Sequence, residues 1–258
     1  MLKDLFPDLK HLQIFYYSDL EELNNLFLKP FSFKILKRSA SHMVFLLIPS
    51  GAERPLYFLK AYQPRPFKRN RVKAFVKNHE RLLKRGIPLL NPLAVFLGSP
   101  ILSLLKKHPF YGGLLYPFME EGFLTGELFL KENSKDLLSS LVRFILELHT
   151  KGVLLGDTKY NNFYLDAKEG FKIFDLDGVK ILDRYPSIEE RLKDLSSLAM
   201  TLEWIGFKEA GTLILEDLVT LLPDIDTKAL SIFKNWIERK RKKRLKRLNT
   251  KIPLASKQ

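Results

Sequence analysis

Three polar side chains follow one another at a spacing typical of phosphoryl-transfer sites. Asp157 comes soon after the segment Leu-His-Thr-Lys-Gly at 148–152, Asn162 lies five residues further on, and Asp175 ends a short apolar segment. A carboxylate can orient an acceptor hydroxyl and take its proton, while an amide oxygen and a second carboxylate suit Mg²⁺. Phosphoryl transfer asks a protein mainly to neutralise phosphates, fix the metal and position the hydroxyl. The order Asp157, Asn162, Asp175 predicts such a site.

Further residues complete the predicted set. Lys159, two residues after Asp157, could touch the transferred phosphoryl group. Lys60 lies in an expected strand, where it could contact the α and β phosphates of a nucleotide, and Glu80 would hold it through an ion pair. Glu80 is the only acid in residues 55–84. We therefore expect Asp157 and Lys159 to be catalytic, Lys60 and Glu80 to bind the nucleotide, and Asn162 and Asp175 to bind metal.

Two more residues are expected to support this site without taking part in the chemistry. Asp194 begins a predicted helix and would brace the backbone of the loop around Asp157. His149 is expected to pack at the end of a helix. Each candidate taken singly also has a simpler interpretation, as a turn aspartate or a solvent-facing lysine. It is the ordered combination that favours chemistry.

The expected secondary structure separates a strand-rich part from a helix-rich part. Hydrophobic periodicity predicts strands at 31–37, 42–48, 56–62, 94–97 and 111–119, and helices at 18–27 and 67–85. After a linker at 120–122, helices are expected at 136–150, 189–205, 209–222 and 227–248. Strands at 162–165 and 171–174 would form a hairpin that brings Asn162 and Asp175 to one site. We expect an α+β fold with a sheet-containing unit at 1–119, a helical catalytic unit at 120–233 and a basic C-terminal helix at 234–258.

Composition excludes several other kinds of site. The 258 residues contain no cysteine, which excludes disulfides, Cys-ligated zinc and a thiol nucleophile. No apolar run is long enough to span a bilayer, and the N-terminal residues lack the apolar segment of a secretory signal, so we expect a cytoplasmic protein. The net charge is +14, but residues 239–258 carry ten Lys/Arg and no acid, which leaves +4 for the rest. An anionic partner is expected mainly at this basic tail.

Four stretches within residues 34–206 resemble a known family. They are Phe-Leu-Lys-Ala-Tyr at 58–62, the segment 79–94 with its Gly-Ile-Pro turn, Ile-Phe-Asp-Leu-Asp at 173–177 and Arg-Leu-Lys-Asp-Leu-Ser-Ser-Leu at 191–198. In this order they resemble the lipopolysaccharide kinase family of the protein-kinase-like superfamily, which phosphorylates Kdo or heptose sugars of the inner core. The resemblance implies a two-lobed protein-kinase-like fold, with a small antiparallel-sheet N-lobe holding one main helix and a larger helical C-lobe. It also implies ATP and Mg²⁺ as cofactors.

The sequence departs from protein kinases at three places. No glycine lies in residues 38–42, where a protein kinase has its Gly-rich loop, and the lipopolysaccharide kinases also tend to lack this loop. Leu155 stands where the family pattern usually has His. Gly156 stands where an Arg would pair with an activation-loop phosphate, so switching by that route is not expected. Together the missing loop and Gly156 favour sugar kinases over regulated protein kinases.

Three functions fit the sequence. The first is an ATP-dependent kinase of a lipopolysaccharide core sugar, with an anionic glycolipid or sugar as acceptor. It would act at the inner face of the inner membrane, with the basic tail in peripheral contact with anionic lipid. The second is an atypical small protein kinase or small-molecule phosphotransferase of the same fold. The third is a pseudokinase scaffold that binds membrane or RNA through its tail; the complete set of site residues argues against it. Nucleic acid is not favoured, because no RNA-binding motif or aromatic row accompanies the basic residues.

Overall fold

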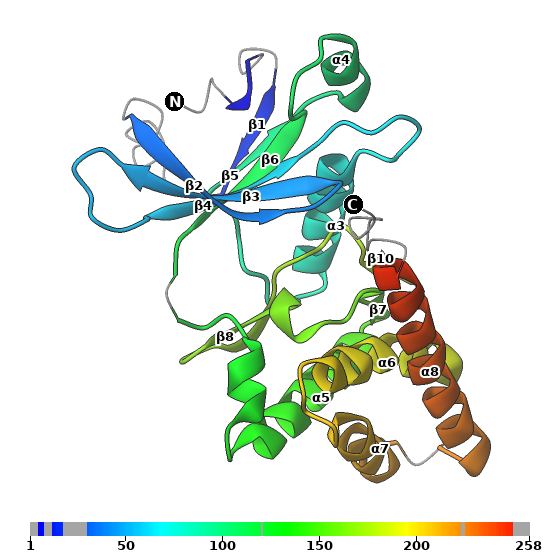
Figure 1. Cartoon of the computed structure of the whole chain (residues 1–258). Helices are drawn as coiled ribbons and strands as arrows, with labels where there is room; N and C mark the ends of the chain where they lie inside the picture. The colour runs from blue at the N-terminus through cyan, green and yellow to red at the C-terminus, as the bar shows by residue number, and fades with distance from the viewer. Residues whose placement is uncertain (1–4, 8–11, 18–29, 120, 223–224, 250–258) are drawn as a thin grey trace, which may run out of the picture. The chain divides into compact units, whose positions relative to one another are not determined.

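The structure is a computed structural model of the chain, and it describes residues 5–7, 12–17, 30–119, 121–222 and 225–249 (Figure 1). The helix expected at 18–27 lies outside the described residues. The chain divides into two compact units. Unit 1 comprises Met1–Lys84 and Leu89–Gly122, and unit 2 comprises Arg85–Pro88 and Phe123–Gln258.

Unit 1 is built on a six-stranded antiparallel sheet with the strand order β1-β5-β6-β4-β3-β2. The strands in that order are Gln13–Tyr16, Ala94–Leu97, Gly112–Pro117, Tyr57–Tyr62, His42–Pro49 and Phe31–Arg38. The five expected strands are confirmed, and β1 is an addition. The helix α3, Arg71–Lys84, packs on β5 and β6. A second helix that the sequence did not predict, α4 at Pro100–Leu105, lies between β5 and β6 in the chain.

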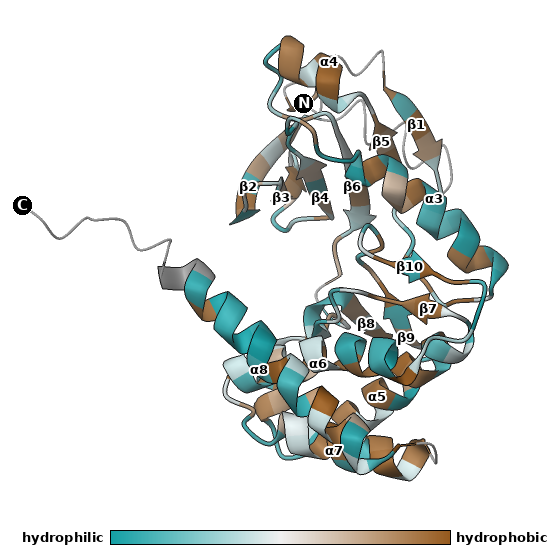
Figure 2. Cartoon of the chain, turned by 90° about the vertical axis from the view of Figure 1, so that its right-hand side faces the viewer, coloured by the Kyte–Doolittle hydropathy of each residue, from teal (hydrophilic) through white to brown (hydrophobic). Residues whose placement is uncertain are grey.

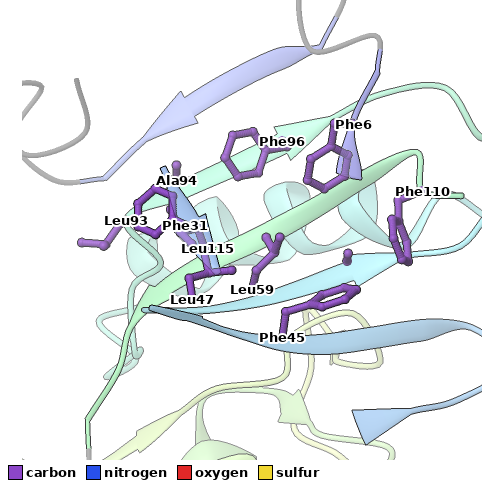
Figure 3. Packing of buried hydrophobic residues seen from close by; sticks show 11 residues of the cluster. Phe6, Phe31, Phe45, Leu47, Leu59, Leu93, Ala94, Phe96, Phe110 and Leu115 are labelled. Carbon is purple, nitrogen blue, oxygen red and sulfur yellow. The ribbon is translucent and has the colours of Figure 1, made fainter. Parts of the chain in front are cut away.

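One face of this sheet carries an aromatic core, shown in Figure 3. The rings of Phe6 and Phe96 stack at 5.5 Å, and Phe45 meets Phe110 edge to face at 5.6 Å. Leu59 of β4 belongs to the same cluster. Because side chains alternate along a strand, the neighbouring Lys60 points to the opposite face of the sheet.

The helix α3 begins later than the sequence predicted. Its first residue is Arg71, not Phe67, because Asn70 caps it: the Asn70 side-chain oxygen accepts a hydrogen bond from the Lys73 amide at 2.9 Å. Phe67 has a φ of +56°, which no right-handed helix can include. In the sequence, the helical spacing of apolar residues extends about one turn before the helix, into a segment that is a loop in the structure.

Unit 2 is mainly helical, with two small two-stranded sheets. Its helices are α5 at Ser134–Thr150, α6 at Ile188–Trp204, α7 at Ala210–Leu221 and α8 at Thr227–Asn249, and α6 packs against the other three. One of these sheets is a hairpin of β8, Phe163–Asp166, and β9, Gly170–Ile173, as expected. The other pairs β7, Val153–Leu154, with β10, Lys180–Ile181, and was not predicted. Two 3₁₀ turns lie at Gly126–Leu130 and Tyr160–Asn162.

The basic C-terminal run belongs to a packed helix. α8 buries Ala229, Phe233 and Ile237, which share one face at four-residue spacing. Most of the rest of the helix is hydrophilic, and is drawn in teal in Figure 2. The run 239–244 continues the same helix, so its side chains are directed by the docking of α8 on α6. Within the described parts of the chain, no helix has both the length and the apolar character needed to cross a membrane.

Candidate active site

A buried carboxylate in α6 holds the loop that carries Asp157. The oxygens of Asp194 accept hydrogen bonds from the backbone N–H of Leu155 at 2.9 Å and of Gly156 at 2.7 Å. The Thr158 hydroxyl donates to the same carboxylate at 2.6 Å. These donors lie on both sides of Asp157 in the chain, so Asp194 fixes the backbone that presents it. The bracing role expected for Asp194 is confirmed.

His149 supplies a fourth donor to this carboxylate. Its Nε2 lies 3.2 Å from Asp194, and the side chains of both residues are buried. Burial by itself would raise the pKa of the Asp194 carboxyl, but the hydrogen bonds from His149, Thr158 and the Leu155 amide outweigh it and lower that pKa. The carboxylate therefore stays ionised and keeps all its donors at neutral pH. His149 is a packed helix-end residue, as expected.

Gly156 is required by the backbone of this loop. Its φ is +74°, a left-handed conformation that glycine adopts without strain. A Cβ added there would lie 3.0 Å from the carbonyl oxygen of Gly178. A larger side chain at this position would therefore meet both a left-handed backbone and the Gly178 carbonyl.

We expect Gly156→Ala to lower the free energy of unfolding more than a matched change at Gly170. Gly170 has φ +78° in the β8–β9 turn, and a Cβ there would meet nothing within 4 Å. The left-handed backbone costs about 1–2 kcal/mol in either variant. Gly156→Ala must in addition displace the Gly178 carbonyl, at a further cost of about 1 kcal/mol. Chemical denaturation of both variants measures the difference, and equal losses would contradict the close approach.

The residues predicted to be catalytic lie together. The Asp157 side chain is 64% exposed, and its Oδ2 accepts a hydrogen bond from Lys159 Nζ at 2.5 Å. The Asn162 side-chain nitrogen donates to the Asp157 backbone carbonyl at 2.8 Å. Asp157 is thus presented to solvent by a loop whose backbone is held from both ends, with a cation beside its carboxylate.

The β8–β9 hairpin brings the two predicted metal ligands to neighbouring positions. The Phe174 N–H donates to the Asn162 carbonyl at 3.0 Å, and Asp175 is the next residue. Because the Asn162 amide nitrogen is used on Asp157, its amide oxygen is left as an acceptor. An amide oxygen and a carboxylate are the hard donors that Mg²⁺ takes when phosphates and water complete its shell. Among the described residues no group of three or more His, Asp or Glu could hold a metal.

Lys60 and Glu80 belong to unit 1. Lys60 is buried in β4, opposite Leu114 of β6, and its ammonium lies 5.4 Å from the centre of the Tyr62 ring. Glu80 is exposed on α3. The roles of these two residues, and the ion pair expected between them, stay predictions.

A strongly basic hollow of about 530 Å³ lies beside Asp157 in unit 2. Among the described residues that line it, Asp157 is the one acid and six are cations. Four of these cations come from α8 and two from the loop and α6: Arg239, Lys240, Lys243, Arg244, Lys159 and Lys193. The potential in such a hollow favours an anionic ligand next to the Asp157 carboxylate.

α8 is held in place beside Asp157 by specific contacts with α6. Lys240 Nζ donates to the Lys193 carbonyl at 2.9 Å and to the Ser197 hydroxyl. Arg241 pairs with Glu203 at 2.6 Å. Burial lowers the pKa of Lys240 to about 8, although the charges of Asp194 and Asp157 act in the opposite direction. Above about pH 8 the hollow therefore loses one of its positive charges.

Sequence reasoning missed this part of the site. It treated the basic run as a tail, whereas in the structure residues of that run line the hollow together with Trp236, and Lys193 lies 4.5 Å from the centre of the Trp236 ring. A usable signal was present: the buried positions 229, 233 and 237 continue at helical spacing to Lys240 and Arg244.

Comparison with known proteins identifies the fold. No protein-family model and no curated protein matches the chain. One solved structure, of a divergent kinase that lacks the glycine-rich loop and regulates membrane ultrastructure of the Toxoplasma parasitophorous vacuole, is 16% identical. The match covers 92% of this chain and 91% of that one, with a TM-score of 0.50. This likeness confirms the expected two-lobed, kinase-like α+β fold.

Two structures of WbdD, described as a bifunctional kinase-methyltransferase, also match. They are 14% and 15% identical, with TM-scores of 0.47 and 0.42. The matches cover 81% and 76% of this chain, and 51% and 47% of theirs.

Proposed function

We propose that this chain, which has a kinase-like fold, is an ATP-dependent phosphotransferase that acts on a hydroxyl of an anionic sugar. The observation that carries the proposal is the exposed Asp157 carboxylate, set in a rigid loop at the wall of a hollow lined by six cations. A carboxylate so placed can accept a hydroxyl proton while the cations bind charged groups of the same molecule.

Each residue has a defined part in this proposal. Asp157 orients the acceptor hydroxyl and takes its proton, and Lys159 meets the transferred phosphoryl group. Asn162 and Asp175 would hold Mg²⁺, which supplies neutralisation of the phosphate charge when it is bound. Lys60 is proposed to contact the nucleotide phosphates, with Glu80 as its partner.

The acceptor that we propose is a Kdo or heptose sugar of the lipopolysaccharide inner core. The sequence resemblance to lipopolysaccharide kinases supports it, and so does the chemistry of the hollow. A core sugar attached to a phosphorylated or carboxylated glycolipid brings negative charges close to its hydroxyls. Lys and Arg side chains on a fixed helix bind such groups through charge-assisted hydrogen bonds.

Radiolabelled ATP with three acceptors tests the proposal. The protein is incubated with Mg²⁺, [γ-³²P]ATP and either purified lipopolysaccharide, casein or no acceptor. We expect label on lipopolysaccharide. Label confined to casein or to the protein itself would reject a sugar acceptor and favour a protein kinase, and no turnover with any acceptor would favour a scaffold.

Charge reversal on α8 should weaken acceptor binding specifically. We expect Arg239→Glu with Lys243→Glu to raise the KM for lipopolysaccharide at least roughly tenfold and to leave the KM for ATP unchanged, because both side chains line the hollow. The matched control is Lys228→Glu with Lys234→Glu, on exposed positions of the same helix outside the hollow. Steady-state kinetics at two salt concentrations measures both pairs. Equal effects of the two pairs would contradict a specific acceptor wall.

A further inference from the structure

The short helix α4 of unit 1 has the reverse of the burial pattern of an ordinary surface helix. Ile101, Leu102, Leu104 and Leu105 are all exposed, the first and last to 71% and 72%, while the polar Ser103 is buried. Figure 2 shows α4 as an apolar ribbon at the end of unit 1. Exposed apolar side chains gathered in this way mark an interaction surface.

α4 is held by its caps. The Ser99 hydroxyl accepts a hydrogen bond from the Leu102 N–H, and Pro100 occupies the first turn. At the other end the His108 N–H donates to the Ser103 carbonyl at 2.8 Å, with Lys107 at φ +56°. Six residues cannot form a stable helix by propensity alone. The fold therefore presents these apolar side chains outward on a fixed support.

The loop 63–70, which is tied to the start of α4, adds a fifth exposed apolar side chain. Phe67 is fully exposed at φ +56°, and the Asn70 side chain donates to the Gly98 carbonyl at 2.9 Å, which ties this loop to the start of α4. Within the described chain, Phe67 and Lys107 are the two non-glycine residues with positive φ. Strained backbone of this kind concentrates at functional sites, and here the two residues lie in the loop 63–70 and directly after α4.

The same surface is strongly basic. A hollow of about 200 Å³ is lined by Arg65, Lys68 and Arg69 of the loop, by Arg71 at the start of α3 and by Pro100 of α4. Residues 55–79 contain no acid, and Lys106 and Lys107 follow α4 directly. Cations beside protruding apolar side chains complement a membrane surface, where phosphates lie above acyl chains.

We infer that unit 1 docks on an anionic lipid bilayer through α4, Phe67 and the basic loop 63–70. The apolar side chains enter the interface and the Lys and Arg side chains meet lipid phosphates. This surface combines exposed apolar side chains with cations better than the basic tail does, because the described part of α8 exposes one large apolar side chain, Leu245. It is independent of the phosphotransferase site, so either can fail without the other.

Vesicle co-sedimentation of the full chain tests the inference without nucleotide or acceptor. Vesicles of phosphatidylcholine alone are compared with vesicles that contain about 30% phosphatidylglycerol. We expect the wild type to bind the anionic vesicles. Binding should be at least roughly tenfold weaker in the double variant Ile101→Ser with Leu105→Ser, and equally so in Lys68→Glu with Arg69→Glu. For the second variant the reason is that each charge near the surface contributes about fivefold to binding. Matched controls are Leu36→Ser and Lys34→Glu with Lys37→Glu, exposed positions of β2 in the same unit.

A depth probe gives a second measurement. Because the chain has no cysteine, Ile101→Cys and Leu36→Cys can each be labelled singly with an environment-sensitive dye. We expect a blue shift on anionic vesicles at position 101 and none at position 36. The inference is overturned if the wild type does not bind vesicles, if the α4 variants bind normally, or if only Arg239→Glu with Lys243→Glu abolishes binding. A dimer in solution that Ile101→Ser dissociates would equally overturn it, in favour of a second copy as the occupant.

Discussion

Asp157→Ala is expected to reduce the turnover of phosphoryl transfer by at least roughly a thousandfold and to leave the unfolding transition unchanged. A positioned general base contributes about 10²–10⁴ in rate, and alanine also removes the group that orients the acceptor hydroxyl. The fold should not suffer, because the Asp157 side chain is largely exposed and its ion pair with Lys159 lies at the surface. Exposed pairs contribute about 0–1 kcal/mol.

The matched control for this experiment is Asp136→Ala, an exposed carboxylate in the first turn of α5. Turnover with saturating ATP and acceptor is measured for both variants, alongside their thermal unfolding. Near-normal turnover in Asp157→Ala would remove Asp157 from the chemistry. A matching loss in Asp136→Ala would show that activity responds to surface charge and not to this carboxylate.

Asp194→Asn is expected to lower the free energy of unfolding by about 3 kcal/mol and to reduce turnover as well. The carboxylate accepts hydrogen bonds from four groups, and an amide would turn a donor toward some of them and leave buried N–H or O–H groups unpaired. The loss of turnover would come through the loosened loop, so the KM for ATP should change less than kcat. In the wild type, the stability that the ionised Asp194 carboxylate contributes is present above the ordinary pKa of Asp. It is lost as the pH falls through the lowered pKa of Asp194 in the folded protein.

Asp217→Asn provides the comparison for Asp194→Asn. Asp217, on α7, accepts one hydrogen bond, from the Ser139 hydroxyl at 3.0 Å, and an asparagine oxygen can still accept it. We expect a loss below about 1 kcal/mol in urea denaturation. Similar losses of unfolding free energy in the two variants would show that Asp194 does not hold the backbone around Asp157 in place.

Much of the fold could be predicted from local patterns. Alternating or continuous apolar segments such as β3 and β5, and long periodic helices such as α5, show their period in the sequence itself. β7 and β10 are two residues long and carry no period. α4 reverses the usual pattern, with its apolar side chains outside, so periodicity could not place it.

The site divides in the same way. Spacing along the chain was sufficient to group Asp157 with Asn162 and to place Asn162 near Asp175 on one hairpin, since a tight hairpin fixes its own register. The basic hollow depends on where α8 packs against α6, a tertiary contact between segments far apart in the sequence. The position of Lys240 beside the loop could therefore not be obtained from spacing.

A crystal structure with Mg²⁺ and a non-hydrolysable ATP analogue tests the central claim most directly. We predict that an oxygen of Asn162 and an oxygen of Asp175 coordinate the cation at about 2.0–2.1 Å, with phosphate oxygens completing its shell. A nucleotide or a cation bound away from both residues would contradict the assignment of this hairpin as the metal-binding part of a phosphotransferase.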